Sequence, residues 1–63
     1  MIEDLRRGKP IRLIYGGDDF GIYTFNKLTR RYEGIIGYLT ADTLKRILNK
    51  ELDFMEIRRV EDV

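Results

Sequence analysis

The chain contains neither cysteine nor histidine, and this absence limits what can hold it together. A chain of 63 residues forms one domain with a small core, and domains of this size are often reinforced by a disulfide or a metal ion. Without cysteine no disulfide forms, and a zinc site would need four carboxylates. The remaining reinforcement is association with another chain. We therefore expect one domain over residues 1–63 that self-associates, with no cofactor and no metal.

The charge balance and hydropathy argue against several classes of protein. Charged residues make up 37% of the chain and the net charge is +1, which is too balanced to demand a nucleic-acid partner. Residues 1–7 carry two acids and no apolar run, unlike a signal peptide. No segment approaches the roughly 20 consecutive apolar residues that a membrane span needs. We expect a cytoplasmic protein with no membrane partner.

Hydrophobic spacing predicts a small α+β domain with the order α-β-β-β-α-β. A mainly antiparallel sheet of about four strands packs on one main helix, and Thr40 is the predicted N-cap of that helix. A short first helix ends at Gly8 and Pro10. The predicted helices cover residues 2–7 and 41–50, and the predicted strands cover residues 11–15, 20–26, 31–39 and 54–60.

Local turn chemistry is most specific between the second and third predicted strands. Asn26 is expected to open a turn through its side chain, and Arg30 takes a position where glycine is commoner. In the third strand, Gly34 and Gly37 indicate a bulge or a close approach of the backbone.

Apolar residues fall on both faces of the predicted sheet. Strict alternation puts Phe20 and Ile22 on one face of their strand, and Tyr23 and Phe25 on the other. One helix covers one face, so the second face needs a partner. The predicted core consists of the helical stripe Leu44, Ile47 and Leu48 packed against Leu13, Ile22 and Ile36.

The two-faced sheet favours a small non-enzymatic binding module that self-associates or binds another protein. The candidate protein-contact residues are Tyr23, Phe25, Ile35 and Met55. The alternative is a nucleic-acid-binding module, in which cations neutralise phosphates and aromatic rings stack on bases. Its candidate residues are Lys27, Arg30, Arg31, Tyr23 and Tyr32. An enzyme is not expected, because the chain has no histidine or cysteine and no nucleotide-binding motif.

The chain resembles known proteins in two ways. Residues 16–20 (Gly-Gly-Asp-Asp-Phe) resemble the signature of diguanylate cyclases, but those domains are more than twice this length, and a solvated hairpin turn is the preferred interpretation. In general make-up the chain resembles short bacteriophage and prophage proteins, through residues 6–10 (Arg-Arg-Gly-Lys-Pro), 26–30 (Asn-Lys-Leu-Thr-Arg) and 37–40 (Gly-Tyr-Leu-Thr). This resemblance implies a binding role toward a host or phage macromolecule and assigns no functional residue.

Overall fold

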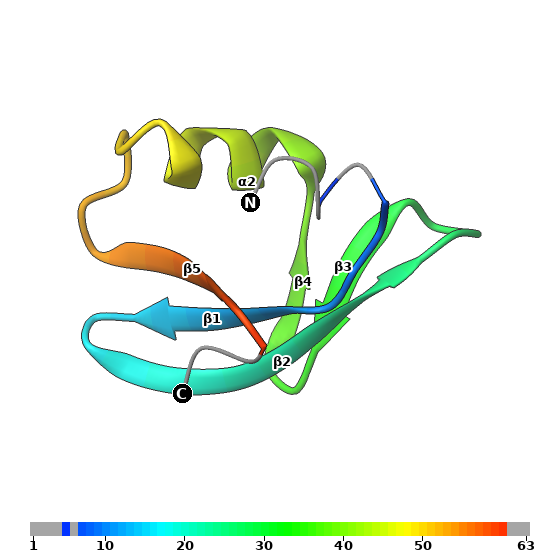
Figure 1. The fold of residues 1–63 in the computed structure, drawn as a ribbon, viewed down its shortest axis with the longest axis horizontal. Coiled ribbons are helices and arrows are strands. Elements are labelled where there is room, and N and C mark those ends of the chain that lie inside the picture. Colours follow the sequence, from blue (N-terminus) through cyan, green and yellow to red (C-terminus); the bar gives the residue numbers. More distant parts are fainter. Residues whose placement is uncertain (1–4, 6, 61–63) are drawn as a thin grey trace.

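The computed structural model describes residue 5 and residues 7–60, and it confirms the predicted α+β class (Figure 1). An antiparallel five-stranded sheet has the order β4-β3-β2-β1-β5, and one helix packs on it. The predicted helix over residues 2–7 lies mostly outside the described residues. The elements are β1 (Ile11–Tyr15), β2 (Asp18–Asn26), β3 (Arg31–Gly34), β4 (Gly37–Leu39), α2 (Ala41–Leu48) and β5 (Met55–Arg59).

The described sheet has one strand more than predicted, because residues 31–39 form two strands instead of one. Gly34 pairs with Gly37, and the chain reverses through Ile35 and Ile36 between them. The prediction of a single strand was wrong because isoleucine favours strands and is unusual in a turn. The two glycines were the local sign that the strand is interrupted.

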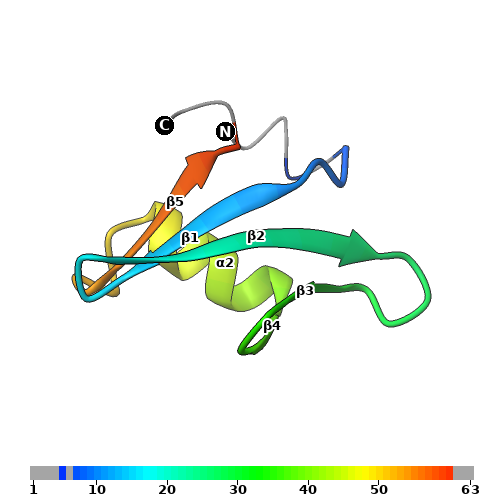
Figure 2. The same ribbon diagram turned by 90° about the horizontal axis from the view of Figure 1, so that it is seen from below.

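Strand β2 is the longest and is shared by two ladders. Its first part pairs with β1, whereas Thr24, Phe25 and Asn26 pair with β3. Seen from below, β2 runs along the molecule in front of α2, with β3 and β4 curling away from it (Figure 2). The sheet therefore curves around one side of the helix.

A β-bulge interrupts the pairing of β1 with β2. The register shifts by one residue between Arg12 and Ile14. Two residues of β2, Phe20 and Gly21, thus oppose the single residue Leu13 of β1. Gly21 has a φ of +85°, a conformation that side-chain-bearing residues rarely adopt. The extra residue switches the alternation of side chains for the rest of β2.

Because of the bulge, the predicted faces of β2 were wrong. Phe20 packs against the core on the same side as Tyr23 and Phe25, while Ile22 is exposed on the opposite face. One helix can then cover most of the apolar surface of this strand. One of the observations that suggested self-association, a second apolar face left uncovered by the helix, is therefore reduced in β2 to exposed Ile22.

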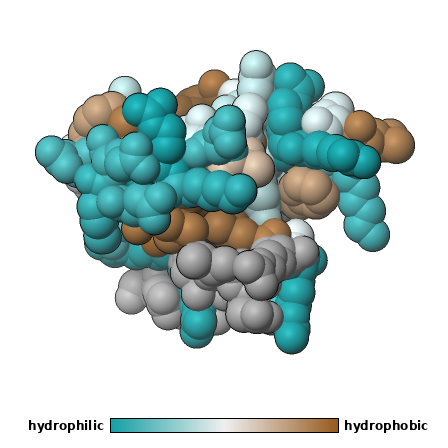
Figure 3. All heavy atoms as spheres, turned by 90° about the horizontal axis from the view of Figure 1, so that it is seen from above, coloured by the Kyte–Doolittle hydropathy of each residue, from teal (hydrophilic) through white to brown (hydrophobic). Residues whose placement is uncertain are grey.

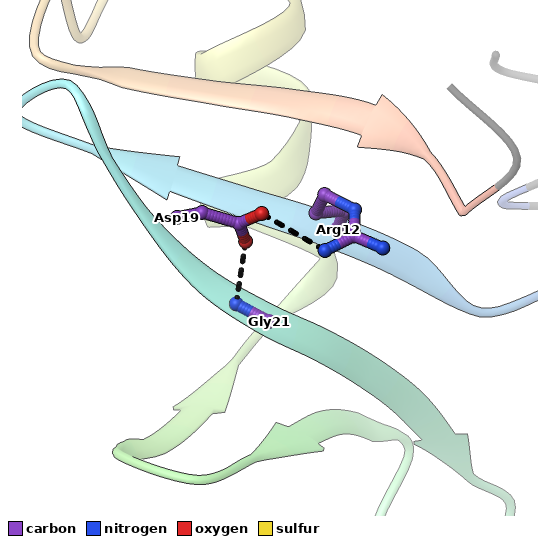
Figure 4. Close-up of polar contacts among 3 residues, drawn as sticks. All are labelled: Arg12, Asp19 and Gly21. Atoms are coloured by element: carbon purple, nitrogen blue, oxygen red, sulfur yellow. Dashed lines mark hydrogen bonds and ion pairs between the residues drawn. The ribbon is translucent and has the colours of Figure 1, made fainter. Parts of the chain in front are cut away.

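The carboxylate of Asp19 holds the bulge in place (Figure 4). Its Oδ1 accepts a hydrogen bond of 2.8 Å from the backbone N–H of Gly21, and its Oδ2 accepts one of 2.9 Å from Arg12 Nη1. The Gly21 hydrogen bond lowers the pKa of Asp19, and the adjacent guanidinium lowers it further, against a smaller opposing effect of burial. Asp19 therefore has a structural role in the run of residues that resembles the cyclase signature.

The core lies between α2 and the concave face of the sheet. Leu13, Leu44 and Ile47 are buried as predicted, but Ile22 and Ile36 are exposed and Leu48 is only half-buried. Ile22 lies on the outer face because of the bulge, and Ile36 lies in a turn. The buried residues are Ile11, Leu13, Tyr23, Tyr32, Leu39, Leu44, Ile47 and Ile57.

Helix α2 begins as predicted and ends earlier than predicted. The Thr40 hydroxyl accepts a hydrogen bond of 3.3 Å from the Thr43 N–H, which confirms the N-cap. At the other end Lys50 adopts a left-handed conformation (φ +63°), and the N–H of Glu51 reaches back to the Arg46 carbonyl at 2.9 Å. This Schellman motif ends the helix at Leu48 instead of residue 50.

Candidate protein-binding surface

The clearest surface feature is the two-residue turn between β3 and β4, here called the isoleucine tip (Ile35 and Ile36). The side chains of Ile35 and Ile36 are 87% and 58% exposed. Turn positions are usually occupied by Gly, Asn, Asp, Ser or Pro, which supply special backbone conformations or local hydrogen bonds. Isoleucine supplies neither, so the turn itself does not account for the two exposed isoleucines.

Tyr23 supports the isoleucine tip from inside the core. Its side chain is only 1% exposed, and its ring lies so close to Gly34 that a Cβ at that position would fall 2.5 Å from the ring. Burial raises the pKa of the Tyr23 hydroxyl, and a hydrogen bond from the Ile36 backbone acts in the opposite direction. The Gly34 backbone at the start of the turn therefore packs directly against a buried ring of the core.

The outer face of the sheet, which points away from α2, is largely occupied by paired charges. Arg58 Nε lies 3.0 Å from Glu56 Oε1, and the Arg31 guanidinium lies 4.1 Å from the centroid of the Tyr38 ring. Together with the Arg12–Asp19 pair, these contacts give this face both signs of charge. It is therefore less suited than the isoleucine tip to an apolar contact.

The structure separates the four predicted protein-contact residues. Ile35 is exposed at the turn, as a contact residue must be. Phe25 and Met55 are half-buried and pack against the core. Tyr23 is a core residue, so its assignment as a contact residue was wrong and its role is to position the tip.

The two tyrosines predicted to stack on nucleic-acid bases are not accessible. Tyr23 and Tyr32 are both buried, and the Tyr32 hydroxyl donates a hydrogen bond of 3.1 Å to the Leu5 carbonyl. Burial raises the pKa of Tyr32. Lys27 and Arg30 are exposed in the β2–β3 loop, while Arg31 is half-buried against Tyr38. The cations remain available, but neither predicted tyrosine can stack on a base.

Besides the isoleucine tip, the β2–β3 loop carries an exposed apolar residue, Leu28, which was not a candidate contact residue in the sequence. Leu28 is 95% exposed. The turn chemistry around it is confirmed: Asn26 Oδ1 accepts a hydrogen bond of 2.9 Å from the Leu28 N–H, and Arg30 has a φ of +58°. Seen from above, an isolated hydrophobic protrusion lies at the right-hand end of the molecule, where this loop is found (Figure 3). A leucine inside a basic, turn-forming segment was the available sequence signal.

A groove of about 550 Å³ lies beside α2, and its walls are mostly apolar. It is lined by Leu5, Phe25, Tyr32, Ala41, Leu44, Lys45, Leu48 and Asn49. Leu5 is the sequence neighbour of residues outside the described part of the chain, and we assign the groove no ligand.

Within residue 5 and residues 7–60, no group of three or more acidic, histidine or cysteine side chains is arranged to hold a metal ion. No helix in that part of the chain is long and apolar enough to cross a bilayer. Comparison of the chain with protein-family models, curated proteins and solved structures found no match.

Proposed function

We propose that this protein is a small non-enzymatic binding module that acts through a protein partner and also associates with copies of itself. The isoleucine tip is the primary contact with the partner. The observation that carries the proposal is the exposure of Ile35 and Ile36 on a turn whose preceding residue, Gly34, packs closely against the buried Tyr23 ring.

The chemistry of the tip defines the kind of partner that it fits. Two adjacent branched aliphatic side chains offer apolar area without a hydrogen-bonding group, so the complementary site is an apolar pocket. Burying each isoleucine contributes roughly 1.5–3 kcal/mol, which suits a small anchor in a protein–protein interface. A nucleic acid offers no such pocket, and the buried tyrosines weaken the alternative further.

Capture of the partner from a cell extract tests this proposal. The tagged wild-type chain should retain a specific protein, and a variant with Ile35→Ser and Ile36→Ser should retain much less of it. Because both side chains are largely exposed, the variant should keep the thermal stability of the wild type within about 0.5 kcal/mol.

Leu28→Ser is the matched control, because it removes a similarly exposed aliphatic side chain from a different loop. It should leave the capture of the partner unchanged. The proposal is contradicted when the double-serine variant is folded and captures the same proteins in the same amounts as the wild type. It is also contradicted when Leu28→Ser abolishes capture while the double-serine variant retains it.

A further inference from the structure

The two ends of the molecule differ in chemistry. The molecule measures 30 by 21 by 21 Å, and β2 follows its long axis (Figures 1 and 2). The β2–β3 loop lies at one end. The β1–β2 turn and the segment between α2 and β5 lie together at the other end, in both views.

The first end, here called the basic end, consists of Lys27, Leu28 and Arg30. Leu28 is the apex, and Lys27 and Arg30 flank it in sequence without an ion pair to any described residue. The loop is firmly held: Glu33 accepts hydrogen bonds from Asn26 Nδ2 at 3.1 Å and from the Thr29 hydroxyl at 3.2 Å. These bonds hold the loop that presents one apolar side chain and two positive charges to the solvent.

The opposite end, here called the acidic end, consists of Tyr15, Phe54, Asp18 and Asp53. The Tyr15 and Phe54 rings are 44% and 52% exposed and meet edge-on, with centroids 5.3 Å apart. The Gly16 N–H donates a hydrogen bond of 2.7 Å to the Phe54 carbonyl, which joins the two segments.

Two carboxylates border this aromatic pair. Asp18 is paired with Tyr15 across the β1–β2 hairpin, and Asp53 precedes Phe54 in the chain. Both are exposed and lack an ion pair within the described residues. The acidic end thus offers an apolar surface with negative charge at its border, which complements the basic end in both respects.

We propose that two copies of this chain associate head to tail, with the basic end of one copy on the acidic end of the next. Leu28 packs on the Tyr15–Phe54 pair, and Lys27 and Arg30 approach Asp18 and Asp53. This inference rests on the self-association included in the proposed function, and it uses residues separate from the isoleucine tip.

Head-to-tail contact has two consequences. A head-to-tail pair keeps one unused basic end on one copy and one unused acidic end on the other, so association is open-ended and does not stop at a dimer. The contact involves a few side chains on each copy, so the surface area that it buries is far smaller than the roughly 1,200 Å² of a stable interface, and association is weak. Because charged pairs contribute to it, association also depends on salt. We expect it at high protein concentration and low ionic strength.

Complementary charge reversal tests the contact. One variant carries Lys27→Glu and Arg30→Glu, and the other carries Asp18→Lys and Asp53→Lys. Sedimentation velocity is run at about 1 mM protein and about 50 mM salt, where salt screens the charges only modestly. Under these conditions the wild type should associate, and each variant alone should be monomeric. An equimolar mixture should associate again, because it restores one native contact between unlike variants. Leu28→Ser should weaken association of the wild type roughly tenfold or more.

Several results would overturn the inference. A wild type that is monomeric under these conditions refutes it, and so does a mixture that stays monomeric while the wild type associates. Association that is lost with Ile35→Ser and Ile36→Ser but unaffected by both charge reversals would place self-association at the isoleucine tip. That outcome refutes the head-to-tail contact and leaves the proposed function intact. Thermal melts of each variant verify that it is folded.

Discussion

Replacement of Gly34 by alanine should disrupt the core and the isoleucine tip together. An alanine Cβ at this position would lie 2.5 Å from Tyr23 Cε1 and 2.6 Å from Cδ1 and Cζ. Carbon atoms in contact prefer separations of about 3.5–4.0 Å, so either the ring or the strand must move by about 1 Å. Tyr23 is among the largest fully buried side chains, and the close-packed core around it leaves no space for such a shift.

The expected cost follows from overpacking. Forcing an additional carbon into a well-packed core typically destabilises a protein by about 1–3 kcal/mol. For a domain of this size each kcal/mol corresponds to roughly 4–8 °C in Tm, so Gly34→Ala should lower Tm by about 5–20 °C. Gly34 does not have a positive φ, so backbone strain adds nothing to this cost.

A double-mutant cycle with Tyr23→Leu isolates the cause. Tyr23→Leu removes Cε1 and Cζ, two of the three atoms that the new Cβ would meet, so Gly34→Ala should cost less in that background than in the wild type. Chemical denaturation of the four proteins followed by circular dichroism gives the coupling energy, which we expect to be at least about 1 kcal/mol, within the usual range for contacting residues. A Tm for Gly34→Ala within about 2 °C of the wild type, or equal costs in both backgrounds, would refute the close approach.

Three further predictions concern stability. Leu44→Ala should cost about 2–5 kcal/mol and unfold the domain or nearly so, because Leu44 is buried, whereas exposed Lys45→Ala should change little; similar thermal shifts for the two would mean that α2 is peripheral. Lys50→Gly should stabilise the domain by about 0.5–1 kcal/mol in urea denaturation, because glycine adopts the left-handed conformation at the helix end without strain, and a loss of stability would contradict the Schellman assignment. The pKa values of Tyr23 and Tyr32 are raised in the folded state, so the unfolded state loses these protons first. The free energy of unfolding should therefore fall as the pH rises above about 10, and a stability that stays constant to pH 12 would contradict the burial of both hydroxyls.

Local chemistry was predictable wherever one residue type determines the backbone. The hydroxyl of Thr40 caps the helix and the side chain of Asn26 opens the turn, as predicted, and Arg30, predicted at a position where glycine is commoner, has a φ of +58°. The periodic apolar residues of α2 identified that helix because Leu44, Ile47 and Leu48 follow helical spacing and do not alternate as strand residues do. These predictions depend on neighbouring residues only.

The prediction of which side chains of β2 face the core was wrong, because strict alternation depends on the exact number of residues along the strand. A single extra residue at Gly21 reverses the orientation of every later side chain in β2, which moves Tyr23 into the core and Ile22 out of it. A glycine within a strand is compatible with both a bulge and an unbroken strand. Ile35 was a candidate contact residue, but the turn that exposes it was missed, since Ile35 and Ile36 have the side chains of strand residues and only their flanking glycines indicate a turn.

The isoleucine methyl groups provide the most direct test of the binding proposal. In a chain with labelled isoleucine methyl groups, the NMR spectrum reports the tip, the core and the outer face of the sheet at once. Addition of the captured partner should shift the methyl signals of Ile35 and Ile36 and leave those of buried Ile11 and Ile47 nearly unchanged. Shifts concentrated on Ile22, with Ile35 and Ile36 unaffected, would place the partner on the outer face of the sheet and contradict the account.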